Sequence, residues 1–162
     1  MANAATTTDR DVIQAYILAD AARTPESRVL LMSTPRGEID PLVSHALKYA
    51  FRPNASRANH FLTELRRRAK TQADYSTLTW RRRIQLTREK LDEISMWERM
   101  ESKRPYIREY RAELPAYLKD GKVAVLQTWE GPNDIHSIRM VTILNRTEKG
   151  WRVGKSYAAY SP

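Results

Sequence analysis

The sequence predicts an α+β fold, in which N-terminal helices, one of them long, precede a C-terminal three-stranded antiparallel β-meander. Up to residue 121, apolar residues recur mainly three and four positions apart, which is typical of amphipathic helices. The last 41 residues are instead rich in Val, Ile, Thr, Trp and Tyr and are divided by turn-forming residues. We therefore expect a flexible tail over residues 1–10, a helical region over 11–121, and a meander over 122–160 that packs on the helices.

The first predicted helix begins at Asp9 or Asp11, because an aspartate at a helix start accepts hydrogen bonds from the free backbone amides. It should end near Arg23, since Pro25 follows. The next apolar run, over residues 29–32, lies between turn-forming residues and fits a lone strand and a loop segment equally well.

Two more short helices are predicted. Asp40 before Pro41 is a favourable cap and first-turn pair, and indicates a second helix that ends before Pro53. A third helix should begin at Asn54 or Ser56 and carry its apolar residues on one side.

The main predicted helix is longer and spans about residues 76–102. At ~1.5 Å per residue it would be about 40 Å long, which is more than a compact core of this size can cover. Pro105 should break or kink it. Its apolar stripe steps by four, seven, three and three residues through Trp80, Ile84, Leu91, Ile94 and Trp97.

A second stripe of tyrosines follows Pro105, through Tyr106, Tyr110 and Tyr117. We interpret these aromatic side chains mainly as helix-packing residues. Because Tyr and Trp are also enriched where proteins meet, four of these aromatic residues are candidates for a partner interface, namely Trp80, Trp97, Tyr106 and Tyr110.

The three predicted strands cover residues 122–129, 135–144 and 151–159. Each is rich in β-branched and aromatic residues, and glycine-containing turns separate them. Alternation along the strands predicts one face that packs on the helices.

The positive charge of the chain is concentrated in one segment. Residues 51–90 hold 11 of the 28 Lys and Arg residues against three acids, and so supply +8 of the formal net charge of +9. A surplus confined to one segment indicates a surface for an anionic partner. Two arginine triplets dominate it, and we expect anion or RNA contact from Arg66, Arg67, Arg68, Lys70, Arg81, Arg82, Arg83 and Arg88.

A triplet on a helix spans about 200° of the surface, so we expect one arginine of each triplet to face the protein. Arginine also offers a planar fork that matches phosphate. Two other readings of the basic segment are an acidic protein or lipid partner, and ordinary solvated helix faces that pair with nearby acids.

Several kinds of chemistry find no support in the sequence. The chain has no cysteine, and its five glycines form no phosphate-binding loop. We therefore expect no catalytic, cofactor or metal site. The N-terminus has no signal-peptide character, and no apolar run is long enough to span a bilayer, so an intracellular location, cytoplasmic or in the mitochondrial matrix, is expected.

These observations favour a non-enzymatic structural subunit of a large assembly such as a cytoplasmic or organellar ribosome, with the basic segment on RNA. Leu, Ile, Val and Phe number only 32, so other protein subunits should cover part of its apolar surface. An alternative is an accessory subunit of a membrane-associated complex of the respiratory or ATP synthase type, without RNA, where the arginines meet acidic subunits or lipid headgroups.

Helices that lead into a curved sheet ending near Gly150-Trp151-Arg152-Val153 also resemble the cone-shaped NTF2-like domains. This resemblance implies a third possibility, a small domain that binds or turns over a small molecule in a pocket between sheet and helices. Such a pocket would be lined by Trp129, Met140 and Tyr157.

Overall fold

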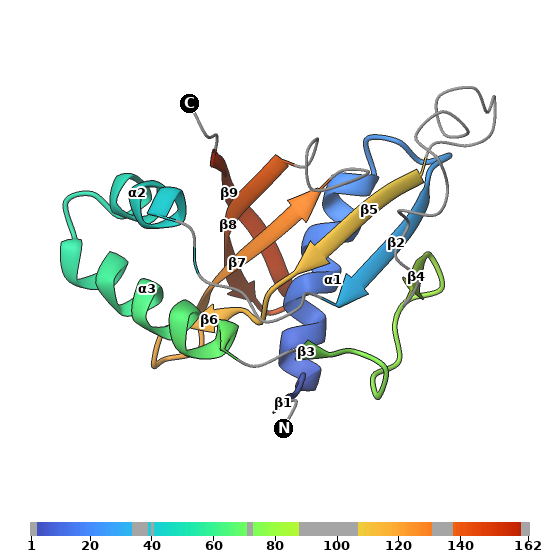
Figure 1. Ribbon diagram of the computed structural model, residues 1–162, viewed down its shortest axis with the longest axis horizontal. Coiled ribbons are helices and arrows are strands. Elements are labelled where there is room, and N and C mark those ends of the chain that lie inside the picture. Colours follow the sequence, from blue (N-terminus) through green and yellow to red (C-terminus); the bar gives the residue numbers. More distant parts are fainter. Residues whose placement is uncertain are drawn as a thin grey trace.

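A computed structural model describes residues 3–33, 39, 41–70, 73–87, 107–130 and 138–159. Its centre is a mixed seven-stranded sheet with helices on both faces (Figure 1). The chain passes through β1 (Asn3–Ala4), α1 (Thr7–Ala21), β2 (Arg28–Ser33), α2 (Pro41–Ala50), α3 (Ala55–Ala69), β3 (Ala73–Asp74), β4 (Ile84–Thr87), β5 (Ile107–Ala112), β6 (Ala116–Tyr117), β7 (Val123–Glu130), β8 (Ile138–Thr147) and β9 (Gly150–Ala159).

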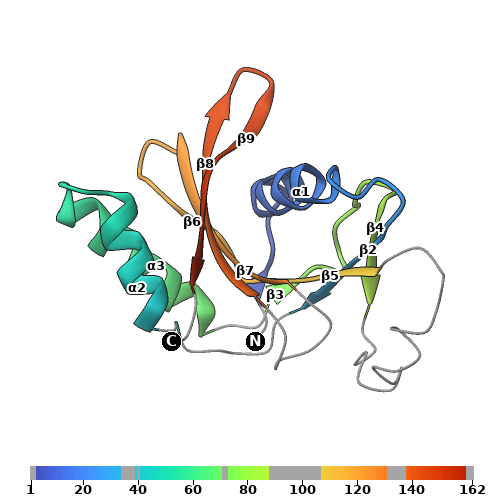
Figure 2. The same ribbon diagram turned by 90° about the horizontal axis from the view of Figure 1, so that it is seen from above.

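The sheet combines a parallel half and an antiparallel half. Its strand order is β4-β2-β5-β7-β8-β9, with β6 also paired to β7. β2 runs parallel to both β4 and β5, whereas β5, β7, β8 and β9 pair antiparallel in turn. The short strands β1 and β3 form a separate parallel pair. Figure 2 shows that the sheet bends around α1, while α2 and α3 cover its other side.

Helix α1 begins at a capping box rather than at Asp9 or Asp11. The Thr6 hydroxyl accepts from the Asp9 amide at 3.2 Å, and the Asp9 carboxylate accepts from the Thr6 amide at 2.9 Å. The helix therefore starts inside the segment that we expected to be a tail. Its apolar residues recur three and four positions apart and are buried against the sheet, namely Val12, Ile13, Tyr16, Ile17 and Ala21.

Polar contacts fix the C-terminal half of α1 to β5 and β7. Arg108 forms a 2.8 Å salt bridge with Asp20, and the Tyr110 hydroxyl donates to the same carboxylate at 2.6 Å. The Tyr16 hydroxyl donates to Glu130, and burial raises the pKa of that carboxyl to about 7. Because these polar groups satisfy one another, the helix can lie against the sheet without leaving them unpaired.

Helices α2 and α3 form the second core with the opposite face of the sheet. Pro41 begins α2 as predicted, and the Asn54 side chain caps α3 by accepting from the Arg57 amide at 3.0 Å. Both helices bury one stripe against β6, β7 and β8, and Phe51 stacks on Phe61 with ring centroids 5.0 Å apart. Because β7 is covered on both faces, residues 124–128 are all buried, without the alternation of a half-exposed strand.

The predicted fold class is wrong, because a mixed seven-stranded sheet replaces both the helix-dominated N-terminal region and the separate meander. Residues 84–87 form a strand and not the middle of a long helix, and Tyr110 and Tyr117 lie on β5 and β6 and not on a second helical stripe. Trp80 and Ile84 do share one core, but Trp80 reaches it from the loop after β3 and Ile84 from the strand β4. The Thr, Trp and Ile residues here favour strands, and β2 supplies the backbone partners that no local pattern could reveal. The rest of the predicted helix, over residues 88–102, lies outside the described residues.

Two ambiguous or partial predictions are now settled. The apolar run at residues 29–32 is a strand, β2, in the parallel half of the sheet. The three C-terminal strands pair antiparallel in sequence order as β7, β8 and β9, but they are part of a larger sheet and not a separate meander.

Substituting Gly154 by alanine should destabilise the β8–β9 hairpin. The strand register shifts between Ile143 and Leu144, opposite Gly154. A Cβ atom on residue 154 would lie 3.1 Å from the Ile143 backbone carbonyl oxygen and 2.9 Å from the side-chain nitrogen of Asn145. The asparagine can move, but the backbone carbonyl is held in the sheet. We expect a loss of about 1–2 kcal/mol in urea unfolding, against less than about 0.5 kcal/mol for the control Lys155→Ala. Equal effects would contradict this account.

Candidate nucleic-acid interface

The first arginine triplet lies in the last turn of α3, and its three side chains point in different directions. Arg66 is exposed. Arg67 is also exposed and pairs with Glu64, one turn earlier on the same helix, at 2.9 Å. This pair lowers the pKa of the Glu64 carboxyl through the hydrogen bond from Arg67. Only Arg68 turns toward the protein interior.

Arg68 joins α3 to the start of α1. It forms a 2.9 Å salt bridge with the fully buried carboxylate of Asp9 and donates to the Pro115 carbonyl at 2.7 Å. The Tyr117 hydroxyl donates to the other Asp9 oxygen at 2.8 Å. A buried carboxylate needs such a set of partners, so the role of Arg68 is structural.

The second triplet lies in the loop between β3 and β4. Arg81 and Arg82 have exposed side chains, and the Arg81 backbone amide donates to Gln14 at 2.8 Å. Arg83 instead reaches the C-terminal end of α1, where it donates to the carbonyls of Ala21 at 3.0 Å and Thr24 at 2.9 Å. Both carbonyls also accept from backbone amides, those of Thr24 and Ser27, so the guanidinium adds a charged donor at this helix end and complements the helix dipole.

In each triplet, therefore, two arginines are exposed and the third contacts the rest of the fold. Of the eight residues predicted to contact an anion, two face inward, and Arg88 lies outside the described residues. Arg67 is exposed but paired. Within the described ranges, no salt bridge involves the remaining exposed side chains, which are Arg66, Lys70, Arg81 and Arg82.

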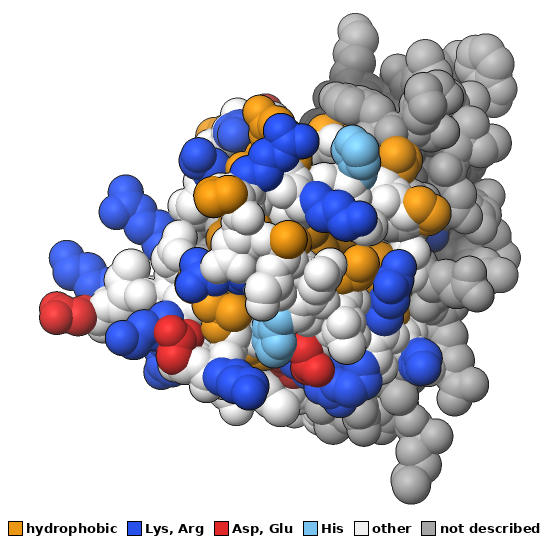
Figure 3. Space-filling view, turned by 90° about the vertical axis from the view of Figure 1, so that its left-hand side faces the viewer, with side chains coloured by type: hydrophobic (Ala, Val, Ile, Leu, Met, Phe, Trp, Pro, Cys, Tyr) orange, Lys and Arg blue, Asp and Glu red, His pale blue; other side chains and the backbone are white. Residues whose placement is uncertain are grey.

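The structure places three further basic residues on the same side of the molecule as the first triplet, and none of the three was among the predicted contact residues. Lys48, Arg52 and Arg57 are exposed on α2, on the connection after it and on the first turn of α3. Residues 41–70 carry seven Lys and Arg residues and one acid, a balance of +6. Figure 3 shows this side of the molecule, where basic side chains are spread over the surface and acidic ones are few. Isolated basic residues give no strong sequence signal, and only the packing of α2 on α3 brings them together.

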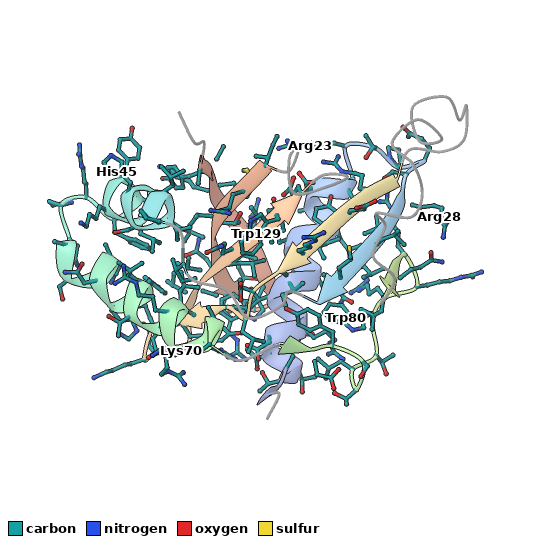
Figure 4. All side chains as sticks on the ribbon, in the orientation of Figure 1. Arg23, Arg28, His45, Lys70, Trp80 and Trp129 are labelled. Atoms are coloured by element: carbon teal, nitrogen blue, oxygen red, sulfur yellow. The ribbon has the colours of Figure 1, made fainter. Side chains whose placement is uncertain are left out.

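Two of the four aromatic residues predicted to face a partner belong to the core. Tyr110 is fully buried, and Trp80 packs against the α1 core, where its indole donates to the Tyr75 carbonyl at 3.1 Å. In Figure 4, Trp80 lies beside α1, while Lys70 marks the end of α3 on the other side. Trp97 and Tyr106 lie outside the described residues. The partner interface we predicted from Trp80 and Tyr110 is therefore corrected to internal packing.

Two polar side chains, those of Glu113 and Gln127, are buried although burial is unfavourable for them. The Glu113 amide, just after the end of β5, donates to the Gln127 carbonyl on β7 at 3.1 Å, so the two residues are neighbours. Glu113 is only 4% exposed, and burial raises the pKa of its carboxyl to about 7. The Gln127 side chain is fully buried, and neither its oxygen nor its nitrogen has a hydrogen-bond partner. The folded protein therefore penalises the charged form of Glu113.

The pocket implied by the NTF2-like resemblance does not form from the expected residues. Gln127, Val141 and Tyr157 are paired neighbours across β7, β8 and β9, and Val141 packs toward α2 and α3. By alternation Trp129 shares that face, whereas Met140 points to the opposite one. The three predicted lining residues therefore cannot surround one cavity.

Other chemistry receives little support. Among the described residues no group of three His, Cys, Asp or Glu side chains could hold a metal ion. His60 contacts the Tyr117 carbonyl at 2.9 Å, and His45 is exposed on α2. None of the helices within the described ranges is long and apolar enough to cross a membrane.

Comparisons of this chain with protein-family models, with curated proteins and with solved structures each found no match.

Proposed function

We propose that this protein is a non-enzymatic structural subunit of an intracellular ribonucleoprotein assembly and that it binds RNA through a basic surface on α2 and α3. We define this basic surface by the exposed residues Lys48, Arg52, Arg57, Arg66, Arg67 and Lys70. The observation that carries the proposal is the balance of +6 over residues 41–70, combined with the exposure of these side chains.

The division within each triplet supports a binding role for the outward arginines. Arg68 and Arg83 are accounted for by contacts within the fold. Within the described residues, no salt bridge involves Arg66 or Lys70. Arg67 has only an exposed salt bridge with Glu64, which contributes little to stability. Exposed arginines on a rigid helix suit contact with a phosphate backbone, which is where most of the affinity for nucleic acid arises.

Such a subunit would act in the cytoplasm or the mitochondrial matrix, as ribosomal subunits do, with other proteins as neighbours. An acidic protein or an anionic lipid surface would attract the same arginines. RNA is the partner we argue for, because several arginines and lysines at separate positions match a repeating phosphate chain better than a single carboxylate cluster.

Removing three positive charges from the C-terminal end of α3 should weaken RNA binding. It should also make the affinity depend less on salt concentration. For the variant Arg66→Gln/Arg67→Gln/Lys70→Gln, the slope of log affinity against log salt should become less steep by about 2, at about 0.7 per single-strand phosphate contact. The measurement is fluorescence anisotropy with a labelled single-stranded RNA between about 50 and 200 mM salt.

The matched control is Lys149→Gln/Arg152→Gln/Lys155→Gln, which removes the same charge from exposed positions on β8–β9. It should leave the slope nearly unchanged, and both variants should keep the wild-type circular dichroism spectrum. Equal losses in the two variants would mean that net charge, and not this surface, attracts RNA. A wild type that binds phosphatidylserine vesicles but no RNA would replace the RNA proposal by the lipid alternative.

A further inference from the structure

Tyr49 is an exposed aromatic residue in the middle of basic neighbours. Its side chain is 61% exposed, whereas the other exposed large apolar residues of the described ranges, Leu86 and Ile138, are aliphatic. A single exposed apolar side chain needs no explanation by itself. The neighbours of Tyr49 distinguish it, because Lys48 precedes it and the Arg52 guanidinium lies over its ring, 5.5 Å from the centroid.

The ring of Tyr49 is also held in place. Tyr157, on β9, meets it in a T-shaped contact with ring centroids 6.0 Å apart and planes at 78°. Two residues later, just after α2, Phe51 stacks on Phe61 and fixes this end of the helix against α3. A ring held by such contacts loses little conformational freedom when a ligand stacks on it.

We propose that Tyr49 and Arg52 form a stacking platform for an unpaired base, so that the basic surface binds single-stranded RNA in preference to duplex RNA. This inference rests on the proposed function and names its ligand more closely. Aromatic rings and arginine planes near basic residues are the features that bind splayed bases, and a duplex keeps its bases stacked inside. Lys48, the residue before Tyr49 on α2, is also exposed and is a candidate for contact with a neighbouring phosphate.

The test compares Tyr49→Ala with Tyr49→Phe on a short oligouridylate and on an abasic strand of the same length. Tyr49→Ala should weaken oligouridylate binding by roughly fivefold to 100-fold, whereas Tyr49→Phe should bind as the wild type does, because the ring supplies the stacking. The salt slope of Tyr49→Ala should equal that of the wild type, because no phosphate contact is lost. The wild type should bind the abasic strand as weakly as Tyr49→Ala binds oligouridylate.

Several results would contradict the proposal that Tyr49 and Arg52 form a stacking platform. Equal binding by Tyr49→Ala and the wild type, equal loss in both Tyr49 variants, or wild-type affinity for the abasic strand or for duplex RNA would each exclude stacking at Tyr49. The melting temperatures of Tyr49→Ala and Tyr49→Phe should be similar, which would show that Tyr49→Ala loses binding without losing its fold. If the α3 triple variant still loses RNA binding when stacking fails, the proposed function stands. If the wild type binds no RNA at low salt, both fail.

Discussion

Replacing Arg68 by glutamine should destabilise the protein by about 3–5 kcal/mol, because it leaves the buried Asp9 carboxylate without its cation. Asp9 is fully buried, and its other partners, the Thr6 amide and the Tyr117 hydroxyl, carry no charge. Arg68 also ties α3 to the Pro115 carbonyl, so the substitution loosens the contact of α3 with β6. The loss would be a large part of a total stability that is typically about 5–15 kcal/mol.

The neighbouring residue provides the control. Arg67→Gln makes the same chemical change one position earlier, where the pair with Glu64 is exposed, and should cost less than about 0.5 kcal/mol. Urea unfolding of both variants gives the comparison. In the double variant Asp9→Asn/Arg68→Gln, the loss should be smaller than the sum of the two single losses, because neither charge is then left alone. Equal losses in Arg67→Gln and Arg68→Gln would show that the buried pair is not what joins these helices.

Glu113 should make the protein less stable as the pH rises from about 4.5 to about 7. Burial raises the pKa of its carboxyl from 4.5 to about 7 in the folded protein. Between these values the folded state binds more protons than the unfolded state, so stability falls with increasing pH and then levels off. We expect Glu113→Gln to remove this loss and to be more stable than the wild type at pH 8 by about 3 kcal/mol, at about 1.4 kcal/mol per pKa unit.

Near pH 4 both side chains are neutral and similar in shape, so Glu113→Gln and the wild type should have nearly equal unfolding free energies. The difference between the two proteins isolates Glu113, since the contribution of Glu130 is present in both. The control Glu148→Gln removes a charge from an exposed turn and should change stability by less than about 0.5 kcal/mol. A difference between Glu113→Gln and the wild type that did not change with pH would contradict the burial of a charged Glu113.

Composition shows which segment of the chain is basic, but it does not show which of its arginines face inward and which face solvent. The charge surplus of residues 51–90 drew attention to α3, since charge is a property of the sequence itself. Which arginine of a triplet faces inward depends on the partner that lies opposite. Arg68 meets Asp9 and Arg83 meets the end of α1, and both partners are more than 50 residues away along the chain. Only the folded arrangement decides these pairs.

Local sequence determined the three helices, because their signals act within a few residues. The buried stripe of α1, the Pro41 start of α2 and the Asn54 cap of α3 all depend on spacing and on caps. The turns that separate β7, β8 and β9 are local as well. Tertiary structure alone decided the parallel half of the sheet, since β2, β4 and β5 are short and pair with strands far away in sequence. A spacing that suits a helix was overridden at β4 because backbone pairing with β2 and burial of Ile84 stabilise the strand, and neither partner is visible in the segment itself.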